Sequence, residues 1–166
     1  SVLSQTYKNF EVIVVDNNSI DNTDTMLKNL NDQRIRLLKI NNNGIIAASR
    51  NMGINASNGE WIAFLDSDDW WHSNKLEKVI HYCSSDYDVC YHDLEIINSK
   101  IRFGFYRKKM SGYQVKKPVF NDLIQLGNAL SNSSVIVRTA LIKQVGGLCE
   151  DKNLIGSEDY ECWIRL

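Results

Sequence analysis

The sequence predicts an α/β fold in which a mostly parallel sheet carries helices on both faces. Residues 12–15 and 61–65 are apolar at consecutive positions, which is typical of strands buried in the middle of a parallel sheet. Segments with helical periodicity lie between and after these strands, so the two kinds of element alternate along the chain. With 166 residues, 43% of them hydrophobic, the chain can bury one sizeable core, and we expect a single domain.

The first half of the chain alternates regularly. The run 34–40 is more alternating in polarity than the two apolar runs, which favours a strand nearer an edge of the sheet. Asp, Asn and Ser are candidate helix caps because their side-chain oxygens can accept backbone N–H groups. In chain order we expect a strand at 12–15, a helix capped by Asp21 or Asn22, a strand at 34–40, a helix at 45–56, a strand at 61–65 and a helix capped by Ser73.

The second half of the chain alternates less regularly, but its helices and strands can still be predicted. Glycines are expected to end its helices, because glycine readily adopts the left-handed conformation found after a helix. Here we expect a strand within 88–97, a helix at 119–126 stopped by Gly127, a buried strand at 133–137, a short helix ended by Gly146-Gly147, and a last helix that Ser157 caps and that opens with Glu158-Asp159.

Charge excludes some functions. The 19 basic and 20 acidic side chains nearly cancel, which argues against a nucleic-acid partner held by bulk charge, and no apolar run is long enough to span a membrane. One stretch, 96–121, has no acidic residue. It is expected to be either a solvated surface hairpin or a flap beside the acceptor site, suited to an anionic acceptor such as a lipid-linked diphosphate at the inner face of a membrane. Its basic residues are Lys100, Arg102, Arg107, Lys108, Lys109, Lys116 and Lys117.

Two of the apolar strands end in carboxylates. Asp66-Ser67-Asp68-Asp69 places three of them on four residues, and like charges this close are tolerated most easily when a divalent cation neutralises them. Mg²⁺ or Mn²⁺ takes one or two carboxylates together with phosphate oxygens, so the cluster suggests a metal–diphosphate site. A solvated acidic turn that caps the next helix is the alternative.

Asp16 and Arg50 are the other candidates at this edge of the sheet. Ligands of doubly wound sheets bind outside the carboxyl ends of the strands, where Asp16 lies. A carboxylate only accepts hydrogen bonds, so Asp16 could bind the imide N–H of a base. Arg50, near the start of a helix, could fork onto a phosphate or a base edge, although a lone helix arginine is more often a surface residue.

Several motifs occur in an order that resembles a known family. They are Ser1-Val2-Leu3-Ser4-Gln5-Thr6-Tyr7, Phe10-Glu11-Val12-Ile13-Val14-Val15-Asp16, Ser19-Ile20-Asp21, Ala48-Ser49-Arg50-Asn51-Met52-Gly53, Phe64-Leu65-Asp66-Ser67-Asp68-Asp69, Gly146-Gly147 and Glu158-Asp159-Tyr160-Glu161. Together they resemble the nucleotide-sugar-binding core of the family 2 glycosyltransferases. The resemblance implies a GT-A fold, which is Rossmann-like, over residues 1–166. It also implies that the family's first strand and its C-terminal part are absent from this chain.

The same resemblance implies an activity. Enzymes of this family move a sugar from a nucleoside diphosphate, usually uridine diphosphate, to an acceptor hydroxyl with inversion at the anomeric carbon, in the synthesis of surface polysaccharides or glycolipids. The expected partners are a nucleotide-sugar donor and a saccharide or lipid-linked acceptor, and the expected location is cytoplasmic, with peripheral membrane contact through 100–117. By resemblance, Asp16 and Arg50 would bind the nucleotide, Asp66 the ribose and metal, Asp68 the Mn²⁺ or Mg²⁺, and Asp159 would be the general base with Glu158 beside it.

Two other functions fit some of these residues. A phosphatase of the haloacid dehalogenase type also places D-x-D at a strand end, but its motif requires Thr or Val where this chain has Trp70. A non-catalytic nucleotide-sugar-binding module would keep Asp16 and Arg50 and could dispense with Asp159. Acidic residues in a first helical turn also favour the helix dipole, which is a structural explanation for Glu158 and Asp159.

Overall fold

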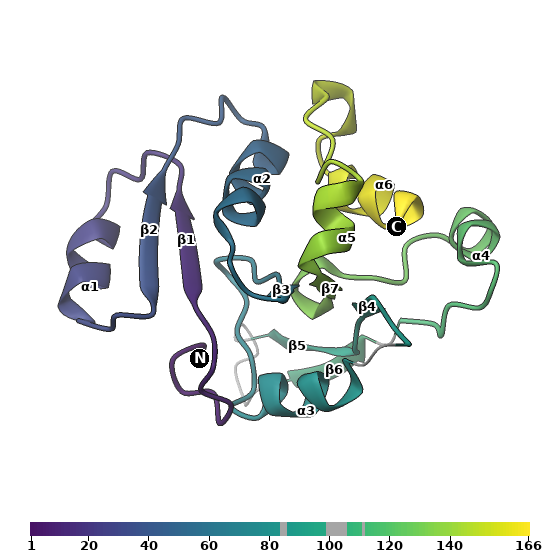
Figure 1. Ribbon diagram of the computed structural model, residues 1–166, viewed down its shortest axis with the longest axis horizontal. Helices are drawn as coiled ribbons and strands as arrows, with labels where there is room; N and C mark the ends of the chain where they lie inside the picture. Colours follow the sequence, from purple (N-terminus) through teal and green to yellow (C-terminus); the bar gives the residue numbers. More distant parts are fainter. Residues whose placement is uncertain (84–85, 99–105, 111) are drawn as a thin grey trace.

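The structure, a computed structural model, describes residues 1–83, 86–98, 106–110 and 112–166 (Figure 1). Its first half alternates as predicted. The elements are β1 (Val12–Asp16), α1 (Thr23–Asn29), β2 (Ile35–Lys39), α2 (Ile46–Ala56), β3 (Trp61–Ala63) and α3 (Lys75–Tyr82).

The second half contains more short elements than the sequence indicated. They are β4 (Val89–Cys90), β5 (Leu94–Asn98), β6 (Tyr106–Met110), α4 (Val119–Leu126), the 3₁₀ helix η1 (Asn132–Ser134), β7 (Ile136–Arg138), α5 (Thr139–Gln144), the 3₁₀ helix η2 (Lys152–Leu154) and α6 (Glu158–Arg165).

The predicted α/β class is confirmed, and the strands form three small groups. β1 and β2 pair in parallel, from Val12 opposite Ile35 to Asp16 opposite Lys39. β7 lies between β3 and β4 and pairs antiparallel with both, while β5 and β6 form an antiparallel hairpin. The described strands therefore include more antiparallel pairing than the expected mostly parallel sheet.

Three predicted elements differ in detail. The strand expected at 133–137 begins as η1, and only Ile136–Arg138 joins the sheet. The strand expected within 88–97 is two strands, because β4 pairs with β7 whereas β5 pairs with β6. Asn74 rather than Ser73 occupies the position that caps α3. In each case the pairing partner or the backbone turn, and not the polarity pattern, decides the boundary.

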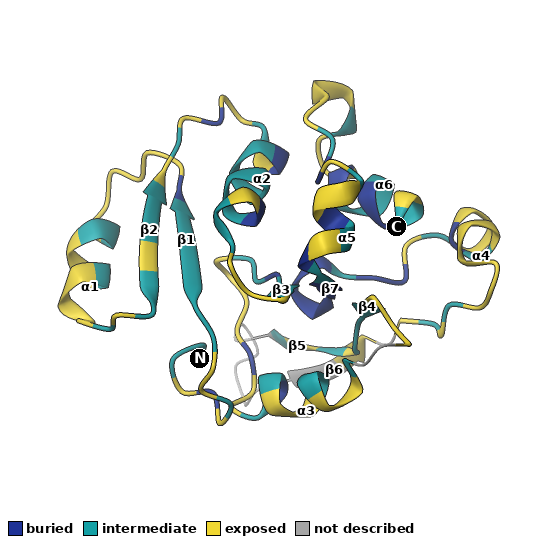
Figure 2. Ribbon diagram, viewed as in Figure 1, coloured by how far each residue is buried: buried dark blue, intermediate teal, exposed yellow. Residues whose placement is uncertain are grey.

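The core lies where β7 meets α5 and α6 (Figure 2). Val135, Val137, Ile142 and Cys162 are completely buried there, and the ring of Phe64 packs edge-on against Trp163 with centroids 5.9 Å apart. Burying these apolar side chains fixes β7 against the two helices. As a result η1, which leads into β7, and the first turn of α6 are both held by the core.

Asn51 of α2 also ties the two halves together. Its side-chain oxygen accepts the N–H of Leu148 at 2.8 Å, and its amide nitrogen donates to the carbonyl of the same residue at 2.8 Å. Gly147, just before Leu148, has φ = +74°, and a β-carbon there would lie 2.5 Å from the Asn51 oxygen. This close approach explains the second glycine of the Gly146-Gly147 pair.

Gly147→Ala is expected to destabilise the protein by more than Gly146→Ala. Both glycines have positive φ, a conformation that costs other residues about 1–2 kcal/mol. A β-carbon at Gly146 meets no atom within 4 Å, whereas at Gly147 it would displace Asn51 from its hydrogen bonds. We expect an additional loss of about 1–2 kcal/mol for Gly147→Ala in urea unfolding. Equal losses in the two variants would contradict this account of Asn51.

Candidate functional site

Four of the predicted site residues line one cavity of about 580 Å³: Arg50, Asp66, Glu158 and Asp159. They come from α2, from the loop after β3 and from the first turn of α6, which the core brings together. The remaining wall residues are His92, Leu94, Met110, Gly112, Asn128, Ala129, Ser131, Asn132 and Gly156.

Arg50 joins two of these carboxylates. Its guanidinium donates to Glu158 Oε1 at 2.8 Å and to Asp66 Oδ1 at 3.0 Å. Only 16% of the arginine side chain and 7% of the Glu158 side chain are exposed, so this ion pair is well shielded from solvent. Arg50 is therefore not a surface residue. Its predicted contact with the nucleotide stays a prediction, and a ligand would share the guanidinium with the two carboxylates.

Glu158 and Asp159 differ in how their oxygens are used. Glu158 accepts from Arg50 with one oxygen and from the N–H of Gly156, at 2.6 Å, with the other. Asp159 accepts the N–H of Tyr160 at 2.6 Å with Oδ1. Burial raises the pKa of Asp159 above its ordinary value, which makes the ionised carboxylate a stronger base. Asp159 is thus the better placed of the two to take a proton.

The loop after Asp66 is anchored to η1 through Ser133. The N–H of Asp66 donates to Ser133 Oγ at 3.0 Å, and the Ser133 carbonyl accepts from Trp71 Nε1 at 3.1 Å and from Lys75 Nζ at 3.2 Å. Asn132 adds a bond from its amide nitrogen to Asp66 Oδ1 at 2.9 Å. The two ends of segment 66–75 are therefore held by the same short helix.

Sequence reasoning missed Asn132, Ser133 and Lys75. The first two belong to a polar run, Ser131-Asn132-Ser133-Ser134, that precedes an apolar stretch. The expected strand at 133–137 includes Ser133 and begins after Asn132. Lys75 is 7% exposed, and its amine lies 3.6 Å from the centroid of the Trp71 ring. Nothing in the sequence pattern distinguishes this lysine from an exposed one.

The acidic loop fits a divalent cation that also binds a diphosphate. Asp68 lies on the exposed side of the anchored loop and forms no hydrogen bond or ion pair with the described residues, so its carboxylate is available. Within the described part of the chain, no three His, Cys, Asp or Glu side chains form a metal-binding cluster. Mg²⁺ and Mn²⁺ sites that use one or two carboxylates take their remaining ligands from phosphates and water. Asp66 and Asp68 suit such a site.

Asp16 lies at the carboxyl end of β1, as predicted, but not on the wall of this cavity. Its side chain is largely buried and its Oδ1 accepts the N–H of Ser19 at 3.0 Å. Hydrogen bonds from Ser19 lower the pKa of Asp16, so it is ionised and can accept a further N–H. The ends of β1 and β2 and the start of α2 lie at the same edge of the fold (Figure 1). The role of Asp16 toward a base stays a prediction.

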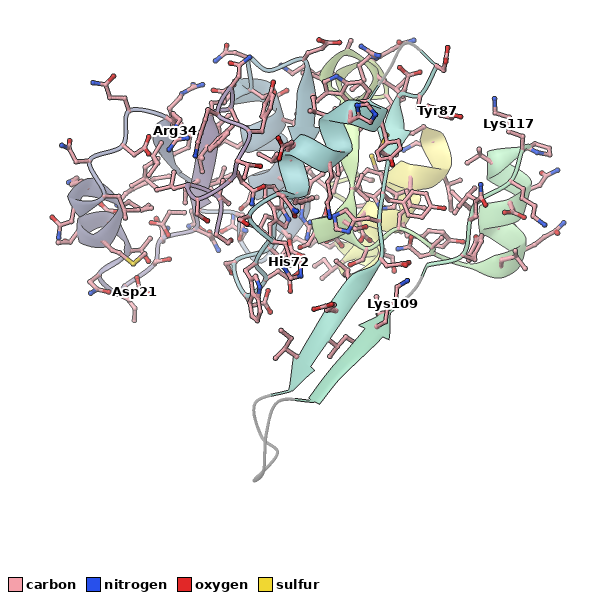
Figure 3. All side chains as sticks on the ribbon, turned by 90° about the horizontal axis from the view of Figure 1, so that it is seen from below. Asp21, Arg34, His72, Tyr87, Lys109 and Lys117 are labelled. Carbon is pink, nitrogen blue, oxygen red and sulfur yellow. The ribbon has the colours of Figure 1, made fainter. Side chains whose placement is uncertain are left out.

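The basic stretch is only partly described. Lys100 and Arg102 lie outside the described residues, and β5 and β6 extend from the body of the protein (Figure 3). Lys109 pairs with Asp93 at 2.6 Å, while Lys116 and Lys117 are exposed. Membrane contact through 100–117 stays a prediction. In the described ranges, no helix has the length and hydrophobicity needed to cross a membrane.

Comparison with known proteins identifies the family. The model of glycosyl transferase family 2 matches residues 1–144. The chain belongs to this family. The resemblance found in the sequence is thereby confirmed, and the family argues against the phosphatase alternative.

Two curated relatives from Escherichia coli match the whole chain. WfgD is 42% identical over 167 residues and WfaP is 30% identical over 173 residues. Each is described as a UDP-Glc:alpha-D-GlcNAc-diphosphoundecaprenol beta-1,3-glucosyltransferase. The chain spans about three-fifths of their length, 61% and 62% respectively.

A solved structure supports the fold. The crystal structure of S. aureus TarS 1–349 matches 89% of this chain and 44% of its own length, with a TM-score of 0.66 and 22% sequence identity. At this identity the likeness concerns the fold alone. It confirms the predicted GT-A architecture.

Lys75→Met is expected to stabilise the fold at low pH and to lose that advantage as the pH rises. Burial lowers the pKa of Lys75 to about 7, whereas an amine in the unfolded chain titrates near ~10.4. Between these values the unfolded chain holds a proton that the folded chain has released, so the free energy of unfolding of the wild type rises with pH. Methionine does not titrate and removes this dependence.

Urea unfolding of the wild type and of Lys75→Met, near neutral pH and in the alkaline range, tests the prediction. The difference in unfolding free energy between Lys75→Met and the wild type should be larger near neutral pH than in the alkaline range. Lys78, an exposed lysine of the same helix, supplies the control Lys78→Met, for which no such trend is expected. A difference for Lys75→Met that does not change with pH would contradict the buried amine.

Proposed function

We propose that this protein is an inverting, metal-dependent glycosyltransferase that moves a sugar from a UDP-sugar to an acceptor hydroxyl. One observation carries the proposal: Asp159, a carboxylate with a raised pKa, lines the same cavity as Asp66 and Arg50. A transferase that inverts in one displacement needs a base for the acceptor and a site for the leaving diphosphate on the two sides of the sugar. The relatives WfgD and WfaP, by their descriptions, use UDP-glucose.

Each residue has a proposed task. Asp66 and Asp68 would hold Mn²⁺ or Mg²⁺, which when bound neutralises the charge of the leaving diphosphate. Asp16 would accept the imide N–H of uracil. Arg50 would hold Asp66 and Glu158 in place and face the phosphates from α2. Asp159 would take the proton of the acceptor hydroxyl as the new bond forms, with Glu158 fixing the start of α6.

The acceptor that we propose is a lipid-linked saccharide. The two Escherichia coli relatives act, by their descriptions, on a GlcNAc-diphosphoundecaprenol. The exposed Lys116 and Lys117 suit the negative charge of such a diphosphate. A non-catalytic binding module remains the other candidate, and it differs in having no use for Asp159.

Asp68→Asn is expected to weaken the binding of UDP in Mn²⁺ by about tenfold or more, because one of the two carboxylates for the metal loses its charge. Calorimetry with and without EDTA measures the effect. Asp69→Asn, which changes the neighbouring exposed carboxylate, is the control and should bind UDP as the wild type does. If EDTA leaves the affinity of the wild type unchanged, the proposed metal role is wrong.

Asp159→Asn is expected to lower kcat by roughly 10²-fold or more while donor binding persists, because the amide cannot take the acceptor proton. The measurement is UDP release from UDP-glucose with a GlcNAc-diphosphate lipid as acceptor. Glu158→Gln is the comparison. Because it weakens the ion pair with Arg50, it should mainly reduce the free energy of unfolding. Full activity in Asp159→Asn would show that Asp159 is not the general base. No turnover by the wild type would favour the non-catalytic binding module.

A further inference from the structure

The cavity beside Asp66 and Asp159 has two buried hydrogen-bonding atoms on its wall residues that no described group uses. They are Asn132 Oδ1 and His92 Nε2. Leaving such an atom unpaired is unfavourable because its hydration is lost without replacement, and native proteins contain few of them. Two at one cavity, next to the proposed reacting groups, suggest a ligand that supplies the missing partners.

Asn132 is oriented by Asp66. The side chain is 5% exposed and its amide nitrogen donates to Asp66 Oδ1 at 2.9 Å. Because the carboxylate beside Arg50 only accepts hydrogen bonds, the NH₂ end of the amide must face it. The Oδ1 end is therefore the acceptor of this amide, and it is directed away from Asp66.

His92 also presents an acceptor. Its Nδ1 lies 2.7 Å from the carbonyl oxygen of Asp93, and a carbonyl only accepts, so Nδ1 carries the hydrogen. Burial, together with the nearby Lys75, lowers the pKa of His92, and the imidazole is neutral at pH 7. In this tautomer Nε2 keeps its lone pair.

We infer that Asn132 Oδ1 and His92 Nε2 accept hydrogen bonds from hydroxyl groups of the donor hexose, and that these two residues set which sugar the protein uses. The inference rests on the proposed function. A hexose is a dense array of hydroxyl donors, and a cavity of about 580 Å³ has the size of a small-molecule site. Asn132 belongs to the donor side because it is bonded directly to Asp66. Both atoms are covered from solvent, so the inference requires that the amide and the imidazole turn toward the cavity when the sugar binds.

This arrangement predicts strong selectivity. A site built to hydrogen-bond a hydroxyl rejects an analogue that lacks it, because its buried polar atom is then left unpaired. The charged side chains of the cavity contribute less to the choice of sugar, because Asp66 and Glu158 already form ion pairs with Arg50. We therefore expect the neutral acceptors of Asn132 and His92, and not the carboxylates, to determine which sugar binds.

Binding of UDP, UDP-glucose and its 2-, 3-, 4- and 6-deoxy analogues, measured by calorimetry, tests the inference. The wild type should lose about tenfold or more in affinity at two hydroxyl positions. His92→Asn keeps a donor toward the Asp93 carbonyl but removes Nε2, and it should abolish the loss at one position. Asn132→Ala should abolish the loss at the other. His92→Gln, which keeps an amide near Nε2, is the matched control and should retain part of the selectivity.

The affinity for UDP alone separates this inference from the proposed function. His92→Asn should bind UDP within about twofold of the wild type, because the one hydrogen bond given for His92 is to the Asp93 carbonyl and not to a proposed nucleotide ligand. Asn132→Ala also removes the bond to Asp66, so its selectivity among the analogues is compared with its own affinity for UDP. If His92→Asn and Asn132→Ala discriminate among the analogues as the wild type does, the two acceptors do not contact the sugar and the inference is wrong. If the wild type binds neither UDP nor UDP-glucose, the proposed function itself fails.

Discussion

The ion pairs of Arg50 are the interaction on which the candidate site depends. One guanidinium, from α2, binds Asp66 of the loop after β3 and Glu158 at the start of α6. Asp66 begins the segment that carries Asp68, and Glu158 precedes Asp159, so this one cation sets the separation of the carboxylates proposed for metal and for acceptor. Without it, the shielded carboxylate of Glu158, with 7% of its side chain exposed, would lack its charged partner, which is a more costly state than the loss of an exposed pair.

The irregular segment around η1 positions the acidic loop that begins at Asp66. Ser133 receives hydrogen bonds from Asp66, Trp71 and Lys75, and Asn132 orients the Asp66 carboxylate. η1 can hold them because Val135 and Val137 immediately after it are completely buried. The core thus fixes a short polar helix, and the polar helix fixes the acidic loop. Asp68, at the exposed part of that loop, forms no hydrogen bond or ion pair with the described residues and is available to a ligand.

Local patterns predicted the regular elements well. The apolar run 12–15 became β1 and ends at Asp16, the helix expected at 45–56 became α2, and the helix at 119–126 became α4 before Gly127. The strand expected at 133–137 differs from the structure, where β7 begins only at Ile136. Its apolar part, Val135 to Val137, is buried as expected, but the two serines before it belong to a 3₁₀ turn, and their polarity does not distinguish such a turn from the start of a strand. The pairing of β7 between β3 and β4 likewise depends on contacts between residues far apart in the chain.

The sequence by itself determined the residue types and their order, and hence the family. Motifs such as Phe64-Leu65-Asp66-Ser67-Asp68-Asp69 consist of residues that are adjacent in the chain, so they can be recognised without knowing how distant segments pack. The tertiary structure alone decided that Arg50 contacts Glu158, 108 residues away, and that both oxygens of Glu158 accept hydrogen bonds while burial raises the pKa of Asp159 on the same cavity wall. It also decided that Lys75 is buried and that Asn132 and His92 each keep a buried acceptor that no group in the described part of the chain uses. Burial and long-range hydrogen bonds depend on how distant segments pack, and neither composition nor periodicity encodes that packing at a single position.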